Sequence, residues 1–255
     1  MCIRDRSLPK FQCGLAGYIS YEAGLSKENI ANAKLNENII PSIYFGLFDI
    51  VFAFDNKLKK AFIFSLNLDK EFKIETTHEI RLLKAKNLYA IPRINSKKDD
   101  VLGFKWVKDF TKKKYISKIN RILRYIKNGD VFQANFTQRF LSKIPNDFNE
   151  IHYYLHYRKK TETPFSCLIK NQDFNILSYS PERFLKLEKN KLKVSPIKGT
   201  IERGQTLDED IKLKKELSSS LKDKAENLMI VDVLRNDISE VCKAGSVKVT
   251  RIAEV

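Results

Sequence analysis

Short apolar runs alternate with turn residues over the first part of the chain, and this pattern predicts antiparallel strands. Residues 16–21 and 42–48 combine glycine with β-branched and aromatic residues, and runs of this kind are typical of strands. The polar stretch at residues 57–60 predicts a hairpin turn between two further strands. A second polar stretch, residues 95–100, ends the pattern. We therefore expect a β-rich domain over residues 1–100.

A helix and then an alternating segment begin the second part of the chain. Apolar residues recur at helical spacing between Tyr115 and Ile126, and Gly129 follows where such a helix would stop. These features predict a helix over residues 113–127. Directly after it, residues 132–139 alternate between apolar and polar side chains, which predicts a strand with one polar face. That face either meets water, the commoner outcome, or lines a site.

The remaining pattern predicts a hairpin, two helices and a last strand. The hairpin spans residues 185–194. Thr206 and Ser220 each precede an acidic residue by three positions, which is the spacing of a helix capping box. The second helix carries the apolar run 228–231 and is expected to be buried, and residues 246–255 have the pattern of a strand. Strands and helices without regular βαβ alternation indicate an α+β fold.

The bulk composition fits a globular chain. Its 255 residues are 43% hydrophobic, which is enough for a sizeable core. No apolar run reaches the ~18 residues that span a bilayer, and the first residues lack the apolar core of a secretory signal, so we expect a cytoplasmic protein with no membrane partner. Four cysteines contain no C-x-x-C pair, which argues against a zinc site or a disulfide framework. They are Cys2, Cys13, Cys167 and Cys242.

The net charge of +16 leaves a nucleic-acid-binding module open as an alternative, because clustered cations attract polyanions. The lysine clusters at residues 112–114 and 212–215 have no interleaved aromatic platform. We interpret them as solvated helix faces in a lysine-rich chain, and we expect no nucleic-acid partner. Such a field would also attract a small anionic substrate.

Three longer motifs stand out in the second part of the chain. They are residues 129–140 (GDVFQANFTQRF), residues 180–184 (SPERF) with 196–200 (PIKGT), and residues 222–237 (KDKAENLMIVDVLRND). In this order and spacing, the motifs resemble those of the chorismate-binding enzymes, a family that includes anthranilate, aminodeoxychorismate and isochorismate synthases. Within the family, the likeness is to the aminodeoxychorismate synthase branch.

The resemblance covers most of the chain. Residues 14–22 and 40–49 are similar to the family's amino-terminal domain, whereas residues 1–7 match nothing in the family. The likeness implies an α+β fold of two facing antiparallel β-sheets flanked by helices, with the substrate between the sheets. Residues 1–100 would then be a partial amino-terminal domain, and residues 110–255 an incomplete chorismate-binding catalytic domain.

The lysine of the PIKGT motif is the most informative residue of the resemblance. In aminodeoxychorismate synthases the matching lysine attacks C2 of chorismate as the C4 hydroxyl leaves, and anthranilate synthases typically have alanine there. Lys198 would therefore be the nucleophile, which requires a free lone pair on an amine that is ordinarily protonated. Gly199 and Thr200 would contact the substrate. Without the motif, Lys198 would be an ordinary surface lysine.

Two glutamates complete the site that the resemblance implies. Glu182 would be the general acid and base near C4, a role that burial would favour; the alternative is an ion pair with Arg183 or a neighbouring lysine. Glu226 would be a ligand of Mg²⁺, a hard ion that prefers carboxylate oxygens and leaves room for an anionic substrate. The alternative for Glu226 is a surface pair with Lys222, four residues earlier.

Other polar residues argue against neighbouring functions. Isochorismate and salicylate synthases have a lysine at the position of Gln133, and an amide cannot act as a base at neutral pH. His152 and His156 have the spacing of a metal pair on a helix, but no glutamate of an H-E-x-x-H motif accompanies them. We interpret these histidines as packing or surface residues.

The resemblance also implies a reaction and a partner. The reaction would be amination of chorismate to 4-amino-4-deoxychorismate for para-aminobenzoate and folate, with ammonia from a glutamine amidotransferase subunit. Anthranilate synthase component I is the alternative. Because the family pattern continues past Val255, we expect a fragment that has no synthase activity alone and exposes apolar surfaces.

Overall fold

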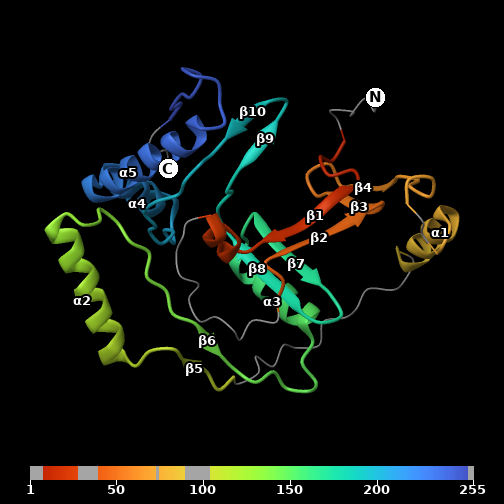
Figure 1. Ribbon diagram of the computed structural model, residues 1–255, viewed down its shortest axis with the longest axis horizontal. Coiled ribbons are helices and arrows are strands. Elements are labelled where there is room, and N and C mark those ends of the chain that lie inside the picture. Colours follow the sequence, from red (N-terminus) through yellow and green to blue (C-terminus); the bar gives the residue numbers. More distant parts are fainter. Residues whose placement is uncertain (1–7, 28–39, 73–74, 90–103, 252–255) are drawn as a thin grey trace. The chain divides into compact units, whose positions relative to one another are not determined.

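The computed structural model describes four stretches of the chain. They are residues 8–27, 40–72, 75–89 and 104–251. These residues combine helices with strands that pair antiparallel, so the fold is α+β as predicted (Figure 1). No helix among them is both long and apolar enough to cross a membrane.

The chain forms two compact units. One consists of Met1–Lys97 together with Ile169–Phe174, and the other of Lys98–Leu168 together with Asn175–Val255. A short segment of the second half of the sequence therefore belongs to the first unit. Each unit is described separately below.

Two antiparallel hairpins and one α-helix form most of the first unit. Its elements are β1 (Gly14–Ile19), the 3₁₀ helix η1 (Tyr21–Lys27), β2 (Ile43–Phe48), β3 (Ile50–Asp55), β4 (Lys60–Ser65) and α1 (His78–Tyr89). β1 pairs with β2, and β3 pairs with β4. The predicted turn at residues 57–60 is confirmed, because the Asp55 carboxylate accepts hydrogen bonds from the backbone N–H groups of Lys57 and Leu58 at 2.9 and 2.8 Å.

An aromatic cluster connects the sequence-distant parts of this unit. Tyr18 and Tyr44 lie opposite each other in the β1–β2 ladder and stack with ring centroids 6.0 Å apart. Phe174 packs edge-on against both rings, at 6.1 and 5.5 Å. Aromatic pairs of this geometry stabilise a fold beyond the area that they bury. This cluster explains why residues 169–174 belong to the first unit.

A charged cluster joins α1 to the connection between β2 and β3 and to the loop after β4. The Arg81 guanidinium lies 2.7 Å from an oxygen of Asp49 and 3.0 Å from an oxygen of Asp69. Asp69 also accepts a hydrogen bond from the backbone N–H of His78, the first residue of α1, at 2.8 Å. Asp69 thereby satisfies one of the unpaired N–H groups at the start of the helix.

The second unit holds the longer helices. Its elements are β5 (Val107–Lys108), α2 (Lys112–Asn128), β6 (Phe140–Leu141), α3 (Glu150–Thr161), most of β7 (Phe165–Lys170), β8 (Asn175–Ser180), β9 (Lys186–Glu188), β10 (Lys191–Lys193), α4 (Leu207–Ser219) and α5 (Leu221–Ser239). The predicted helix over residues 113–127 is confirmed as α2. It ends at Gly129, which has a φ of +82° and whose N–H bonds to the Ile126 carbonyl at 3.1 Å.

The best-covered part of this unit lies between α3 and β8. Tyr154 of α3 is only 8% exposed and stacks on Tyr179 of β8, with ring centroids 5.5 Å apart. Burial raises the pKa of Tyr179 to about 12, because a phenolate would lose its hydration there. This pair is the centre of an aromatic core that also contains Tyr153 and Tyr157.

The predicted second hairpin and both predicted capped helices are confirmed. β9 and β10 pair through a tight turn in which Lys189 and Asn190 have φ values of +48° and +59°. Thr206 caps α4 by accepting a hydrogen bond from the Glu209 N–H at 3.2 Å. Ser220 caps α5 in the same way, by accepting from the Asp223 N–H at 3.3 Å.

Three sequence predictions differ from the structure. Residues 132–139 form no strand, and the pairing of this segment with β5 begins only at Phe140 of β6, whereas a strand requires a hydrogen-bonded neighbour. Residues 246–251 likewise form no strand, and residues 252–255 lie outside the described part. The burial predicted for the apolar run of α5 is also wrong, because Leu228 and Met229 are 48% and 38% exposed.

Gly129→Ala tests the helix stop. The left-handed φ of +82° at Gly129 disfavours a Cβ, so we expect a loss of about 1 kcal/mol in the free energy of unfolding. Gly24→Ala is the matched control, because a Cβ would meet open space at both positions and only Gly129 has positive φ. Equal losses in urea unfolding of the two variants would contradict this explanation.

The charged cluster predicts a dependence of stability on pH. The pKa of Asp69 lies below its ordinary value of 3.8, because the His78 N–H donates to the carboxylate and Arg81 lies beside it. The ionised carboxylate therefore stabilises the fold near neutral pH, and this contribution is lost as the pH falls through the lowered pKa. We expect Arg81→Gln to lower the melting temperature at pH 7 and the difference from the parent chain to shrink toward pH 3. A difference that stays constant would argue against the cluster.

Candidate functional site

The lysine motif, residues 196–200, lies in the loop that follows β10 (the lysine loop). Gly199 has a φ of +74°, a conformation that side chains rarely adopt. A Cβ at this position would lie 2.9 Å from Cγ of Asp223 and 3.0 Å from Cδ1 of Leu217. Both the backbone conformation and the lack of space therefore require glycine here. The lysine loop therefore lies directly against the end of α4 and the first turn of α5.

The two helices beside the lysine loop, α4 and α5, are separated by a single residue. Ser220 follows α4 and precedes α5. Its N–H bonds to the carbonyl oxygens of Glu216 and Leu217 at 3.1 and 3.3 Å, and its Oγ accepts from the Asp223 N–H. One residue thus satisfies the end of one helix and the start of the next, which fixes Leu217 and Asp223 on either side of the motif.

The first turns of α5 present two carboxylates. Asp223 and Glu226 are both half-buried, and their spacing of three residues puts them on the same face of the helix. The alternative pair between Glu226 and Lys222 does not form. Among the described residues, neither carboxylate has a hydrogen-bond or ion-pair partner. An uncompensated, half-buried carboxylate is a donor that suits a hard cation.

Lys198 is half-buried as well, and its amine has no hydrogen-bond or ion-pair partner in the described part of the chain. The contact of Gly199 with Asp223 brings the lysine motif next to the acidic face of α5. Two of the predicted site segments thus meet in the structure. Thr200, the last residue of the motif, is exposed.

Glu182 lies apart from these contacts. It follows β8, is exposed, and its backbone N–H donates to Oγ of Ser180 at 3.3 Å. The alternative ion pair with Arg183 does not form, because the Arg183 guanidinium stacks 4.5 Å from the centroid of the Phe165 ring. Among the described residues, Glu182 forms no hydrogen bond or ion pair with Lys198 or Glu226.

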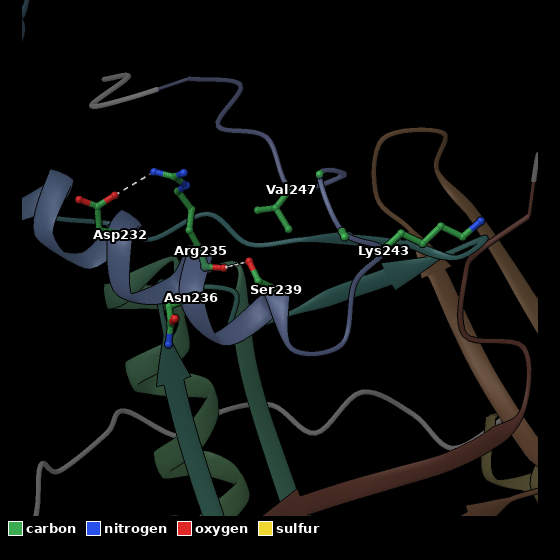
Figure 2. Close-up of a pocket in the computed structure, with 8 residues that line it drawn as sticks. Asp232, Arg235, Asn236, Ser239, Lys243 and Val247 are labelled. Atoms are coloured by element: carbon green, nitrogen blue, oxygen red, sulfur yellow. Dashed lines mark hydrogen bonds and ion pairs between the residues drawn. The ribbon is translucent and has the colours of Figure 1, made fainter.

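A cavity that the sequence did not indicate lies at the end of α5. It measures about 450 Å³, and Asp232, Arg235, Asn236 and Ser239 line it together with the turn after the helix. In Figure 2, Asp232 and Arg235 form an ion pair on one side of the helix. Spacings of three and four residues place these side chains on one helix face. The sequence signal was the polar spacing of Asp232, Arg235 and Asn236 within the third motif.

None of the predicted site residues lines this cavity or the neighbouring one. The neighbouring cavity, of about 430 Å³, lies beside Phe132 and Met229. Gln133 is half-buried, and its Oε1 has no hydrogen-bond partner among the described residues. No group of three or more metal-binding side chains gathers around Glu226 or elsewhere in the described part.

Comparisons with known proteins agree with the motifs. The family model described as chorismate binding enzyme matches residues 3–255, so the expectation that residues 1–7 lie outside the family is wrong from residue 3 onward. Aminodeoxychorismate synthase component 1 of Escherichia coli is 31% identical over 97% of this chain and 51% of its own length. The chloroplastic aminodeoxychorismate synthase of Arabidopsis thaliana is 36% identical over 95% of this chain and 27% of its own length.

Anthranilate synthases are similar too. Component 1 of Aquifex aeolicus is 30% identical over 98% of this chain and 51% of its own length. The crystal structure of component I from Streptococcus pneumoniae superposes with a TM-score of 0.82 at 25% identity, over 97% of this chain and 55% of that one. The chain therefore has the α+β fold of that enzyme, and it spans about half or less of the length of these relatives.

Proposed function

This chain belongs to the family of chorismate-binding enzymes, and we propose that it serves the amination of chorismate to 4-amino-4-deoxychorismate. The observation that carries the proposal is the contact of Gly199 with Asp223. This contact places the lysine loop against the acidic face of α5. The backbone next to Lys198 is confined, because the Asp223 and Leu217 side chains lie on either side of Gly199. The relatives named aminodeoxychorismate synthase support the same branch.

Lys198 would act as the nucleophile. Its Nζ lone pair forms a bond to C2 of chorismate, both ring double bonds shift by one position toward C4, and the bond from C4 to its hydroxyl breaks. Ammonia then adds at C4, both double bonds shift back, and the lysine leaves C2. The amine reacts only without its proton. The Lys198 side chain is half-buried and has no hydrogen-bond or ion-pair partner among the described residues.

Glu182 would exchange protons at C4. Protonated, it gives a proton to the departing hydroxyl, which leaves as water, and the resulting carboxylate takes a proton from the incoming ammonia. Glu182 is exposed after β8, so the burial that would favour this role is absent among the described residues, and a bound substrate would have to exclude water from it. Gly199 and Thr200 would contact the substrate beside the lysine.

Glu226 fits a role as a ligand of Mg²⁺, because its half-buried carboxylate is not neutralised by a cation of the described residues. Bound there, the ion would supply positive charge that holds a carboxylate of the substrate. Glu226 itself would fix the place of that charge on the first turns of α5. Its position one helical turn after Asp223 keeps it close to the contact between Asp223 and Gly199.

Ammonia would come from a glutamine amidotransferase subunit, and the reaction would take place in the cytoplasm on the way to para-aminobenzoate and folate. Anthranilate synthesis is the second candidate, favoured by the likeness to anthranilate synthases. Ammonia then attacks C2 directly and no lysine adduct forms. The two candidates therefore differ in what Lys198 does.

Substitutions of Lys198 distinguish a nucleophile from a substrate clamp. In the complete gene product, supplied with chorismate, Mg²⁺ and ammonium, we expect Lys198→Ala to abolish aminodeoxychorismate formation and any residual turnover to shift toward anthranilate. Lys198→Arg keeps the positive charge but offers no accessible lone pair, so it should be about as inactive as the alanine variant. Product would be followed by chromatography, and the adduct by mass spectrometry of the intact protein.

Two results would overturn this proposal. Near-native aminodeoxychorismate formation by Lys198→Arg would reduce the lysine to a substrate clamp. Direct formation of fluorescent anthranilate by the parent enzyme would favour the second candidate instead.

Glu226→Gln tests the metal role with a readout other than turnover. We expect the complete gene product to bind Mg²⁺ at least about tenfold more weakly in titration calorimetry after this change, because a neutral amide is a poor ligand for a hard cation. Glu240→Gln, an exposed residue at the other end of the same helix, is the matched control and should bind as the parent does. Equal affinities in all three proteins would remove Glu226 from the metal site.

A further inference from the structure

The side chain of Asp223 has no part in the mechanism above. It nevertheless lies directly against Gly199, the residue that follows Lys198. A Cβ built on Gly199 would lie 2.9 Å from Cγ and 3.1 Å from Cβ of Asp223. Distances below 3.0 Å are not found for real Cβ atoms, so the glycine backbone and this side chain are in close contact. Leu217 forms the other wall, 3.0 Å from the same point.

The local hydrogen bonds explain why the carboxylate is available for this position. Asp223 is the third residue of α5, where an acidic side chain ordinarily turns back to bond the N–H of the capping residue. That N–H belongs to Ser220 and already bonds to the carbonyl oxygens of Glu216 and Leu217. Asp223 therefore cannot complete the capping box, and its side chain lies against Gly199 instead.

The equivalent residue of α4 does turn back past the start of its helix, to the residue that precedes the cap Thr206. Glu209 is also the third residue of its helix, and its Oε2 accepts a hydrogen bond from the backbone N–H of Gln205 at 2.7 Å. The two helices begin with the same spacing but use the acidic residue differently. In α4 the acidic residue stabilises the helix start, and in α5 it supports the lysine motif.

We propose that Asp223 is a positioning residue for Lys198: its side chain limits where the backbone of Gly199, and with it the lysine loop, can lie. We call this contact the steric seat. The inference rests on the proposed role of Lys198 as nucleophile. The backbone of Gly199 is confined between Asp223 and Leu217, and Lys198 is its immediate neighbour. Because misplacement of a reacting group by about 1 Å can lower a rate about a hundredfold, a seat of this kind affects turnover more than substrate binding.

Substitutions at the seat separate its shape from its charge. In the complete gene product at saturating Mg²⁺, we expect Asp223→Ala to lower kcat at least about tenfold with little change in KM. Asp223→Asn keeps the shape and should retain most of the activity. Glu209→Gln, which alters the matched residue of α4, should leave kcat unchanged. An asparagine variant as impaired as the alanine variant would overturn the steric seat.

A double-mutant cycle tests the contact itself. Gly199→Ala introduces a Cβ against Asp223, and Asp223→Ala removes the Cγ that it would meet. We expect the melting temperature of the double variant to fall less than the sum of the two single losses, because the two changes relieve each other. Additive losses in melting temperature would show that Gly199 and Asp223 are not coupled through this contact.

The two readouts also separate this inference from the proposed function. If the parent enzyme forms no aminated product but the cycle is non-additive, the seat exists and the proposed reaction is wrong. If the parent enzyme forms the product and Asp223→Ala keeps full kcat, the proposed reaction stands and the positioning role is wrong.

Discussion

The hydrogen bonds of one serine determine the geometry around the lysine motif. Ser220 ends α4 with its N–H and begins α5 with its hydroxyl, so the two helices meet without a flexible connection. Because both helix ends are satisfied by the same residue, Leu217 and Asp223 stay at a fixed separation, and the backbone of Gly199 fits between them. The conformation of the motif thus follows from hydrogen bonds at a neighbouring junction rather than from contacts made by the lysine itself.

Elsewhere, the chain relies on clusters at the edges of its elements more than on a deep core. Among the described residues only Tyr154 and Asn227 are buried, at 8% and 7% exposure. The first unit is held by stacked rings across β1 and β2 and by the charged cluster of Arg81, and the second by the tyrosines of α3 and β8. Apolar side chains such as Leu228 lie on open surfaces, and surfaces of this kind favour association with other polypeptide.

Local signals in the sequence were sufficient for the elements whose stability is local. The stop at Gly129, the caps at Thr206 and Ser220, and the β9–β10 turn depend on residues within a few positions of each other, so propensity and spacing predicted them. The strand expected at residues 132–139 and the burial expected for Leu228 depend on what lies across from them, which no local pattern contains. The motifs likewise indicated which residues to examine, whereas the contact between Gly199 and Asp223 required the fold.

The path of the chain through β7 and β8 has a consequence for how the protein can be divided. The tip of that hairpin, Ile169–Phe174, belongs to the first unit although its strands lie mostly in the second. Phe174 contributes a ring to the cluster with Tyr18 and Tyr44, so a cut near residue 97 would deprive that cluster of one of its members. The two units are therefore not consecutive modules that recombination could exchange intact, and they are expected to be inherited together.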